Sequence, residues 1–261
     1  MSQPLSLYLD RPSRVQRLHP LTKLVVVVLI LVSGLALPGV WAGYAVLLFL
    51  VLPLAIWSRV QRELLVTTAK VTFPFAISVF LIQGFLWPGG TPLISLGPLS
   101  LKTEGLLFAI RSVGRIMVVV GGFLWFAYTT RPDRLMVALN QKGLPNSLVY
   151  MVVATLQIVP RFQNRAAAIL DAQRSRGLET QGNLLVRSRA LLPLVIPLVL
   201  SSLIDVEERA MAIEARGFNR GGLKTSLVEI AEAAWEPPAR WVILLMAVLL
   251  LGASIWLRIA R

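Results

Sequence analysis

Two short arginine-containing segments, forty residues apart, are the part of this sequence best suited to charged recognition. The first reads Ala172-Gln173-Arg174-Ser175-Arg176-Gly177-Leu178 and the second reads Ala212-Ile213-Glu214-Ala215-Arg216-Gly217-Phe218. Both follow the pattern A-x-x-(S/A)-R-G-(L/F). A guanidinium group pairs in a planar, two-pronged geometry with carboxylates and phosphates. Each copy therefore offers a cation suited to an acidic partner.

The residues beside each arginine predict that it lies at the C-terminal end of a helix. An arginine in the last turn favours the negative end of the helix dipole. Gly177 and Gly217 are expected to end their helices in the left-handed conformation. Ser175 and Ala215 are small enough to let another surface approach. One such copy is most simply a solvated helix end, but two copies in the same context favour a pair of docking sites.

The elements that position these arginines are predicted from proline, glycine and helical periodicity. We expect helices from Pro132-Asp133 to Gly143, from about 147 to 177, and from about 184 to 217. Pro193 and Pro197 should kink the third helix. Its apolar stretch at 190–203 is too short to span a bilayer comfortably, and whether it spans, dips in or lies flat stays open.

The composition is that of a membrane protein. Of the 261 residues, 56% are hydrophobic and 15% are charged, whereas soluble domains carry about 45–50% apolar and about 25% charged residues. Five apolar runs are long enough to be candidate spans. They cover about 21–37, 40–57, 71–87, 105–128 and 241–257, with a polar loop at 88–103 between the third and fourth. We therefore expect an all-α polytopic protein with about five transmembrane helices.

Positive charge in the short loops predicts the orientation. Arginine and lysine are concentrated before the first run and between the second and third, which places the N-terminus and, after four spans, the segment from Arg131 to Arg240 in the cytoplasm. The chain then divides into a membrane region at 1–130, a cytoplasmic or interfacial region at 131–239, and a C-terminal span at 240–261. The side on which the C-terminus lies stays open, because Arg258 and Arg261 oppose the outside placement that five spans require.

Several kinds of chemistry are excluded by what the sequence lacks. There is no cysteine and only one histidine, His19, which removes disulfides, thiolate metal sites and cysteine nucleophiles. No G-x-x-x-x-G-K-(S/T) phosphate-binding loop occurs, so any ATP must be bound by another chain. The net charge is +13. With such hydrophobicity, we assign this charge to the membrane surface and an acidic protein partner and not to nucleic acid.

Most of the chain resembles a known family, the T component of energy-coupling-factor (ECF) transporters, which includes cobalt and nickel transport permease subunits. The resemblance lies in the two arginine motifs and in three further stretches. These are His19-Pro20-Leu21-Thr22-Lys23-Leu24, Gly143-Leu144-Pro145 and Val159-Pro160-Arg161-Phe162.

This resemblance implies a non-catalytic subunit in the inner membrane that works with two ATP-binding-cassette ATPases and a small, membrane-embedded, substrate-binding S component. It implies that Arg176 and Arg216 each dock on one ATPase. The flanking residues of these coupling sites are Ser175, Gly177, Ala215 and Gly217. Small residues and prolines suggest the surface for the S component, at Gly114, Gly121, Gly122, Pro193 and Pro197. No cofactor is expected on this chain, and vitamins and cobalt or nickel ions stay equally open as substrates.

Three alternative functions fit the sequence less well. An ion-coupled secondary transporter usually needs intramembrane carboxylates, and the predicted spans contain none. A conventional ABC permease would carry one coupling loop with a characteristic motif. Glu232-Ala233-Ala234 resembles the start of that motif, but Pro237-Pro238 follows and the resemblance ends there. A membrane enzyme would have to use the acidic group Asp205, Glu207 and Glu208, for which ion pairing on a helix surface, with Arg209 adjacent, is the simpler account.

Overall fold

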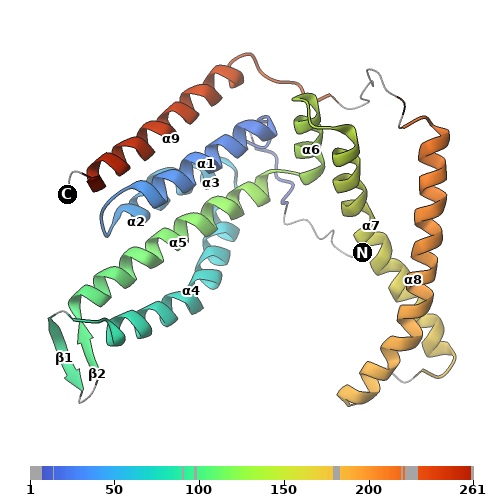
Figure 1. The fold of residues 1–261 in the computed structure, drawn as a ribbon, viewed down its shortest axis with the longest axis horizontal. Helices are drawn as coiled ribbons and strands as arrows, with labels where there is room; N and C mark the ends of the chain where they lie inside the picture. The colour runs from blue at the N-terminus through green and yellow to red at the C-terminus, as the bar shows by residue number, and fades with distance from the viewer. Residues whose placement is uncertain are drawn as a thin grey trace. The chain divides into compact units, whose positions relative to one another are not determined.

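The structure is a computed structural model, and it describes residues 8–259 apart from 14, 90, 97–98, 179–182, 219 and 221–228. The chain divides into two compact units, shown together in Figure 1. One contains Ser6–Gly143 and Ile230–Arg261 and is called the membrane unit below. The other contains Leu144–Glu229 and is called the two-helix unit. The regions predicted at 1–130, 131–239 and 240–261 describe placement relative to the membrane, and they stay a prediction. Contacts between residues group the helix that follows Arg131 with the membrane unit.

Every helix of the membrane unit corresponds to a predicted span, apart from the short helix that follows Arg131. The first is α1 (Pro20–Ala36), and the second run forms α2 (Ala42–Val46), η1 (Leu47–Val51) and α3 (Leu52–Trp57). The remaining helices are α4 (Gln61–Leu86), α5 (Thr103–Thr129), α6 (Pro132–Gln141) and α9 (Glu236–Ile259). The wider turn of η1 ends two residues before Pro53, which lacks the N–H that an ordinary α-helical turn would use.

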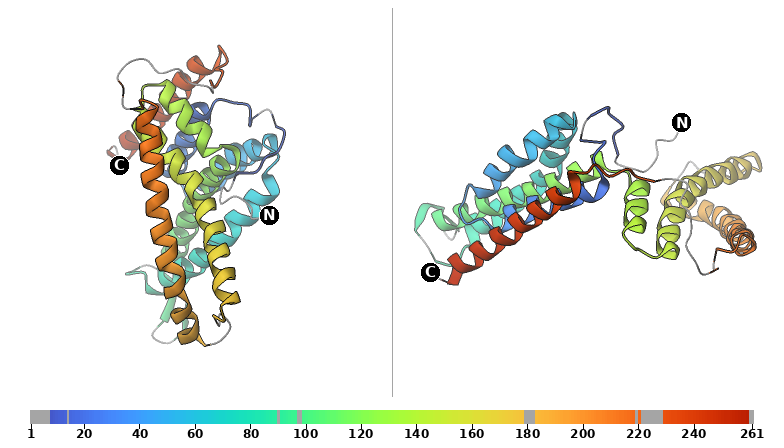
Figure 2. Two further views of the ribbon diagram at one scale, coloured as in Figure 1. Left: turned by 90° about the vertical axis from the view of Figure 1, so that its right-hand side faces the viewer. Right: turned by 90° about the horizontal axis from the view of Figure 1, so that it is seen from above.

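The core of the membrane unit forms where α5 packs against α1, α2 and α4, while α9 lies along α1 (Figures 1 and 2). Ile30, Val51, Val118 and Trp125 are almost completely buried there. The indole N–H of Trp125 donates a hydrogen bond of 3.0 Å to Ser58 Oγ, so this buried polar atom is satisfied.

The polar loop predicted at 88–103 contains a small antiparallel hairpin. Strand β1 (Pro92–Leu96) pairs with β2 (Leu99–Lys102), and an irregularity separates the pairs made by Pro92 and Ile94. The two strands link α4 to α5. They are the only strands in the ranges that the structure describes, so the all-α prediction is confirmed apart from this hairpin.

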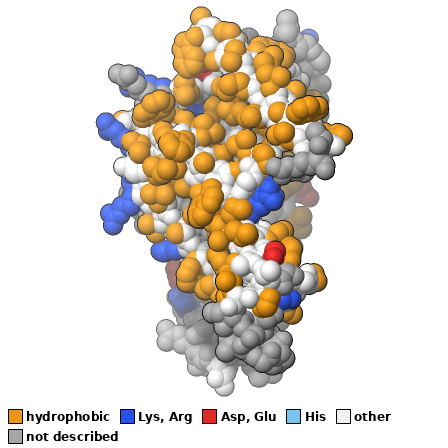
Figure 3. All heavy atoms as spheres, turned by 90° about the vertical axis from the view of Figure 1, so that its left-hand side faces the viewer, with side chains coloured by type: hydrophobic (Ala, Val, Ile, Leu, Met, Phe, Trp, Pro, Cys, Tyr) orange, Lys and Arg blue, Asp and Glu red, His pale blue; other side chains and the backbone are white. Residues whose placement is uncertain are grey.

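Hydrophobic side chains cover much of the outside of the membrane unit, as one face in Figure 3 shows. Three of its helices are long and apolar enough to cross a membrane, namely α4, α5 and α9, and two further apolar helices are shorter, at Pro20–Ala36 and Ala42–Trp57. Exposed large residues such as Phe49 (77%) and Val248 (65%) would be costly in water. This surface is that of a protein embedded in lipid.

The two-helix unit consists of α7 (Asn146–Ser175) and α8 (Leu184–Ala215), which run in opposite directions and cross each other (Figure 1). The three helices predicted after Arg131 are therefore confirmed within one or two residues at each end. Helix α8 continues without interruption through Pro193 and Pro197 and bends along its length in this view.

Candidate functional site

The two arginine motifs form nearly identical helix ends. Arg176 caps α7 with φ −91° and ψ 9°, and Arg216 caps α8 with φ −82° and ψ 3°. The following glycines are left-handed, with φ +88° at Gly177 and +68° at Gly217, which confirms the conformation predicted for them. The repeat in the sequence is thus a repeat of backbone geometry.

The hydrogen bonds after each arginine are those of a Schellman motif. At the end of α7, Leu178 N–H donates to Gln173 O (3.0 Å) and Gly177 N–H donates to Arg174 O (2.9 Å). At the end of α8, the corresponding bonds run from Phe218 to Ile213 (3.1 Å) and from Gly217 to Glu214 (2.9 Å). Both turns satisfy the last carbonyls of their helices with the same pair of bonds.

The space around the two glycines is open. Among the described residues, a Cβ atom at Gly177 would meet nothing within 4 Å, and one at Gly217 would meet Arg220 Cβ at 3.9 Å. Glycine is therefore required here for its left-handed conformation and not because neighbouring atoms of this chain leave no room. The absence of a side chain at each glycine removes one obstacle to the approach of another surface beside the arginine.

Both arginines are exposed and have no ion-pair partner in the part of the chain that the structure describes. Neighbouring charges, by contrast, are paired within the helix, since Arg174 lies 3.5 Å from Asp171. Ser175 Oγ donates to the carbonyl of Asp171 at 3.1 Å. The hydroxyl is thereby turned back onto the helix, and Arg176 is left as the outward-facing cation at this end.

The antiparallel arrangement puts the two arginines at opposite ends of the unit. Arg176 ends α7 shortly before α8 begins, and Arg216 lies at the far end of the 32 residues of α8. At 1.5 Å per residue, a straight helix of this length separates the ends by about 48 Å. Two such distant ends cannot contact one small partner site, and they suit two separate docking sites.

An ion pair joins the two helices between their ends. Arg165 Nη1 lies 2.7 Å from Asp205 and also donates to the carbonyl of Ser201 at 3.2 Å. The hydrogen bond from Arg165 lowers the pKa of Asp205 below its usual value. The sequence predicted that Asp205 pairs along its own helix; the structure instead shows Asp205 pairing across to Arg165 on α7.

A groove of about 550 Å³ runs beside this ion pair. Its walls carry Arg161, Arg165, Arg209 and Asp205 among apolar side chains. Phe218, which follows the second motif, packs on Tyr150 with ring centroids 5.2 Å apart. The aromatic contact fixes the turn after Gly217 against the start of α7.

The apolar stretch at 190–203 presents an exposed surface in its described part. Val195, Ile196, Val199, Leu200 and Leu203 are between 47% and 57% exposed. Pro193 and Pro197 lie in the same stretch and are partly buried. This surface is apolar, unlike the two arginine ends, and suits a partner or lipid of hydrophobic character.

Gly114, Gly121 and Gly122 lie buried in the membrane unit. A Cβ at Gly114 would come within 2.7 Å of the Tyr44 ring, and one at Gly122 within 2.8 Å of Ile30. These glycines let α5 pack closely on the chain's own helices. The contact with a second membrane protein predicted for them stays a prediction, and here the residues have a packing role.

A buried polar cluster lies at the start of α1 and α9, and sequence reasoning missed it. Glu236 accepts hydrogen bonds from the His19 backbone N–H (3.0 Å) and the Thr22 hydroxyl (2.6 Å), and Arg240 Nε donates to Thr22 (2.9 Å). Arg240 also forms an ion pair with Glu232. The stretch from His19 to Leu24, which carries part of the family resemblance, therefore holds α1 to α9. The proline pair at 237–238, preceded by an acidic residue, is the sequence signal for this helix start.

The same cluster binds the two points where the chain leaves and re-enters the membrane unit. Lys142, one residue before Gly143, lies 3.2 Å from Glu232, three residues after the end of the two-helix unit. Desolvation alone would raise the pKa of Glu232, but the hydrogen bond from Lys142 and the charges of Arg240 and Lys142 together lower it below its usual value. Lys23 adds a further link, donating to Thr129 O at 2.7 Å. No group of three or more potential metal ligands occurs among the residues that the structure describes.

Comparison with known proteins shows similarity over most of the chain. Residues 12–227 match the sequence profile of the family described as CbiQ, cobalt transport protein. The chain is 29% identical over 263 residues to the energy-coupling factor transporter transmembrane protein EcfT of Listeria innocua, covering 97% of both chains. The proteins of the same name from Staphylococcus aureus (29%, covering 84% of this chain and 85% of the relative) and Brevibacillus brevis (26%, covering 94% and 95%) are also similar.

Proposed function

This chain belongs to the CbiQ family of cobalt transport proteins, and from that premise we propose that it is the transmembrane scaffold of an ECF importer, which transmits ATP hydrolysis by two ATPase subunits to an S component. The observation that carries the proposal is the pair of matching helix ends at Arg176 and Arg216. Each presents an exposed arginine beside a left-handed glycine, and the two are separated by the length of α8.

Each arginine docks in an acidic groove of one ATPase. A guanidinium group that forms a buried pair with a carboxylate is expensive to remove, since truncating one partner of such a pair at an interface costs about 2–5 kcal/mol. The Schellman turn fixes the backbone at the arginine, so little ordering is needed on docking. This chain supplies the contact and binds no cofactor; ATP is bound by the partners.

The N-terminus and the two-helix unit lie on the cytoplasmic side in this proposal, as the positive charge of the short loops favours. The S component contacts the membrane-facing surfaces, including the exposed apolar face of α8 beside Pro193 and Pro197. The buried glycines Gly114, Gly121 and Gly122 contribute by holding α5 in place. The transported substrate is a vitamin or a cobalt or nickel ion.

Two alternatives are less well supported by the same observations. In a conventional ABC permease Glu232 would be part of an exposed coupling loop, but here it is engaged by Lys142 and Arg240. In an ion-coupled transporter a carboxylate would lie at mid-membrane, whereas the acidic residues of α4, α5 and α9 are in their first turns.

Charge reversal tests the docking of the ATPases. The double variant Arg176→Glu/Arg216→Glu is expected to insert in the membrane but to lose co-purification with the ATPases and substrate uptake. Arg174→Glu is the matched control, because Arg174 lies one turn from Asp171 on the same helix end and its charge is paired within the chain. Retained co-purification and uptake in the double variant would overturn the proposal.

A further inference from the structure

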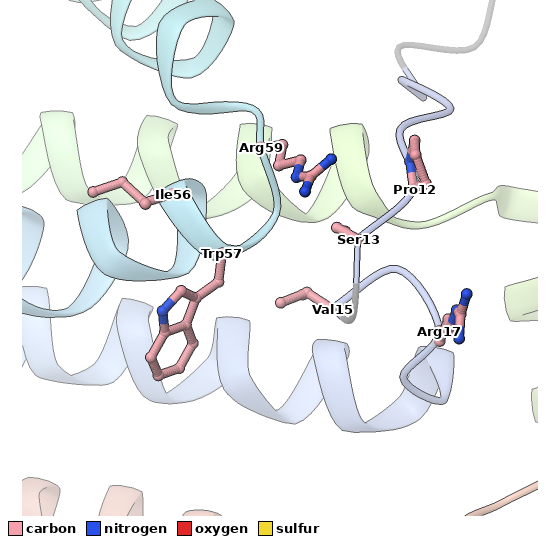
Figure 4. Close-up of a pocket in the computed structure, with 7 residues that line it drawn as sticks. All are labelled: Pro12, Ser13, Val15, Arg17, Ile56, Trp57 and Arg59. Carbon is pink, nitrogen blue, oxygen red and sulfur yellow. The ribbon is translucent and has the colours of Figure 1, made fainter.

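A second cavity, in the membrane unit, is separate from the two arginine motifs. It has a volume of about 810 Å³ and lies between the N-terminal segment and the end of α3. Figure 4 shows Arg59 extending towards the N-terminal segment at Ser13, and Val15 extending from that segment towards Trp57. Pro12, Arg17 and Ile56 also line this cavity. We call this cavity the interfacial pocket.

The interfacial pocket carries two positive charges that nothing in the described chain neutralises. Arg17 and Arg59 are both exposed, and neither forms an ion pair with a described carboxylate. The acidic residue near this corner, Glu63, is already bound by Arg11 at 2.5 Å. The pocket therefore complements an anion and not a cation.

Arg59 occupies a backbone position that favours glycine. Its φ is +58°, and it is the one non-glycine residue with a positive φ in the described ranges. Arg59 N–H donates to Ile56 O (3.0 Å) and Val60 N–H donates to Ala55 O (3.0 Å), the same Schellman pattern as at the two motifs. Glycine fills this position at 177 and 217.

A strained residue at such a position points to a use for its side chain. The turn is held by Arg11, whose guanidinium donates to the Arg59 carbonyl at 2.6 Å. This contact supports the backbone without using the Arg59 guanidinium. The charged group is left pointing into the pocket, where a glycine would have supplied the turn alone.

The apolar part of the pocket lies at the end of a membrane helix. Trp57 is 69% exposed and Ile56 is 51% exposed at the end of α3, two residues before Arg59 in the turn that leads to α4. Tryptophan at a helix end is typical of the level of lipid headgroups. Basic pockets between membrane helices at this level bind anionic headgroups.

We propose that the interfacial pocket binds an anionic glycerophospholipid, with its phosphate between Arg17 and Arg59 and an acyl chain along Trp57 and Ile56. The combination of a cationic end with an apolar wall at the membrane boundary favours a lipid over a soluble anion. In the orientation proposed above the lipid belongs to the cytoplasmic leaflet. The binding itself requires neither the ATPases nor the S component.

The test measures binding to the full chain purified without partners in neutral detergent. Phosphatidylglycerol and phosphatidylcholine are titrated separately, and bound lipid is counted by native mass spectrometry. Wild type is expected to retain phosphatidylglycerol preferentially. Because each basic residue at an anionic surface contributes a similar attraction, Arg17→Gln and Arg59→Gly should each weaken retention about fivefold, and the double variant about thirtyfold.

The controls separate charge from folding. Arg59→Gly places glycine where the turn favours it, so its melting temperature should be maintained or raised while its lipid retention falls. Arg59→Lys should keep most of the binding, and Arg62→Gln, an exposed arginine outside the pocket wall, should keep all of it.

Three results would overturn the proposal. They are equal retention of the two lipids by wild type, unchanged retention in the double variant, and full competition by inorganic phosphate, which would identify a site for a free anion. Failure of any kind here leaves ATPase docking at Arg176 and Arg216 untouched, since no partner is present in the assay.

Discussion

Lys142 and Glu232 are 90 residues apart in sequence, yet their side chains form an ion pair of 3.2 Å. They lie where the chain leaves the membrane unit and where it returns. Both connections to the two-helix unit are thereby joined to one buried cluster, whose centre is Arg240. The cluster thus ties both connections to the start of α1 and α9.

Neutralising a charged residue of this cluster should destabilise the protein more when that residue is more deeply buried. The side chain of Arg240 is 11% exposed and that of Lys142 is 51% exposed. Arg240→Gln leaves Glu236 and Glu232 without their buried partner and should cost about 3 kcal/mol, whereas Lys142→Gln should cost under about 1 kcal/mol. Thermal unfolding in detergent measures both. Equal losses of unfolding free energy in the two variants would show that burial does not set the contribution of these charges.

Alanine at the two left-handed glycines should disturb docking more than folding. Gly177→Ala and Gly217→Ala each force a side chain into the left-handed region, at about 1–2 kcal/mol. The turn should then relax and misplace its arginine, reducing co-purification of the ATPases. Gly252→Ala is the matched control, because this helical glycine also has open space around it and alanine favours the helix. An equal loss of ATPase co-purification in all three variants would contradict the role of the left-handed turn.

The ion pair between α7 and α8 should set the separation of the two motifs. We expect Arg165→Asp to broaden the distance distribution between spin labels at Ala172→Cys and Ala212→Cys, and Arg165→Asp/Asp205→Arg to narrow it again. Labelling is specific because the chain has no cysteine of its own. Pulsed electron spin resonance gives the distributions. A distribution that the single reversal leaves unchanged would rule out this role.

Close helix packing predicts a graded response to alanine in the membrane unit. A Cβ at Gly43 would lie 2.5 Å from the backbone of Gly114, which cannot move aside, so Gly43→Ala should be strongly destabilising. At Gly121 the nearest atom would be Val51 Cγ1 at 3.6 Å, an ordinary contact. The free energy of unfolding of Gly121→Ala should therefore lie within about 0.5 kcal/mol of the wild-type value. A reversed order would contradict the packing described for α2 and α5.

Acidification should destabilise the membrane unit through His19. Burial and the neighbouring Arg240 lower the pKa of His19, with Glu232 and Glu236 opposing and Lys142 adding to the effect. The unfolded chain then takes up the proton first, so this contribution to stability is complete above the ordinary value of about 6.5 and is lost as the pH falls below it. Melting curves from pH 8 to 5.5 measure the loss.

The control for the pH dependence is His19→Asn, which keeps a side-chain acceptor at the start of α1. The variant should have a flatter stability profile over the same range. An unchanged slope would assign the dependence to other groups.

The sequence by itself determined the membrane character, the helices and the geometry of the two motifs, because these depend on local physics. Apolar runs reveal spans by their length, proline and glycine mark helix ends, and Gly177 and Gly217 follow their arginines at the positions where a left-handed turn is favoured. The two arginines could be recognised without any tertiary contact, because the motif and the helix end are both local features of the sequence.

Only the tertiary structure decided which residues meet across long sequence separations. Nothing local pairs Lys142 with Glu232, joins Asp205 to Arg165, or buries Gly114 against Tyr44. Each depends on which helices become neighbours, and helix periodicity alone does not specify a neighbour. The unusual turn at Arg59 was hidden for a related reason, because sequence rules expect glycine there and only the backbone angle reveals that an arginine has taken its place.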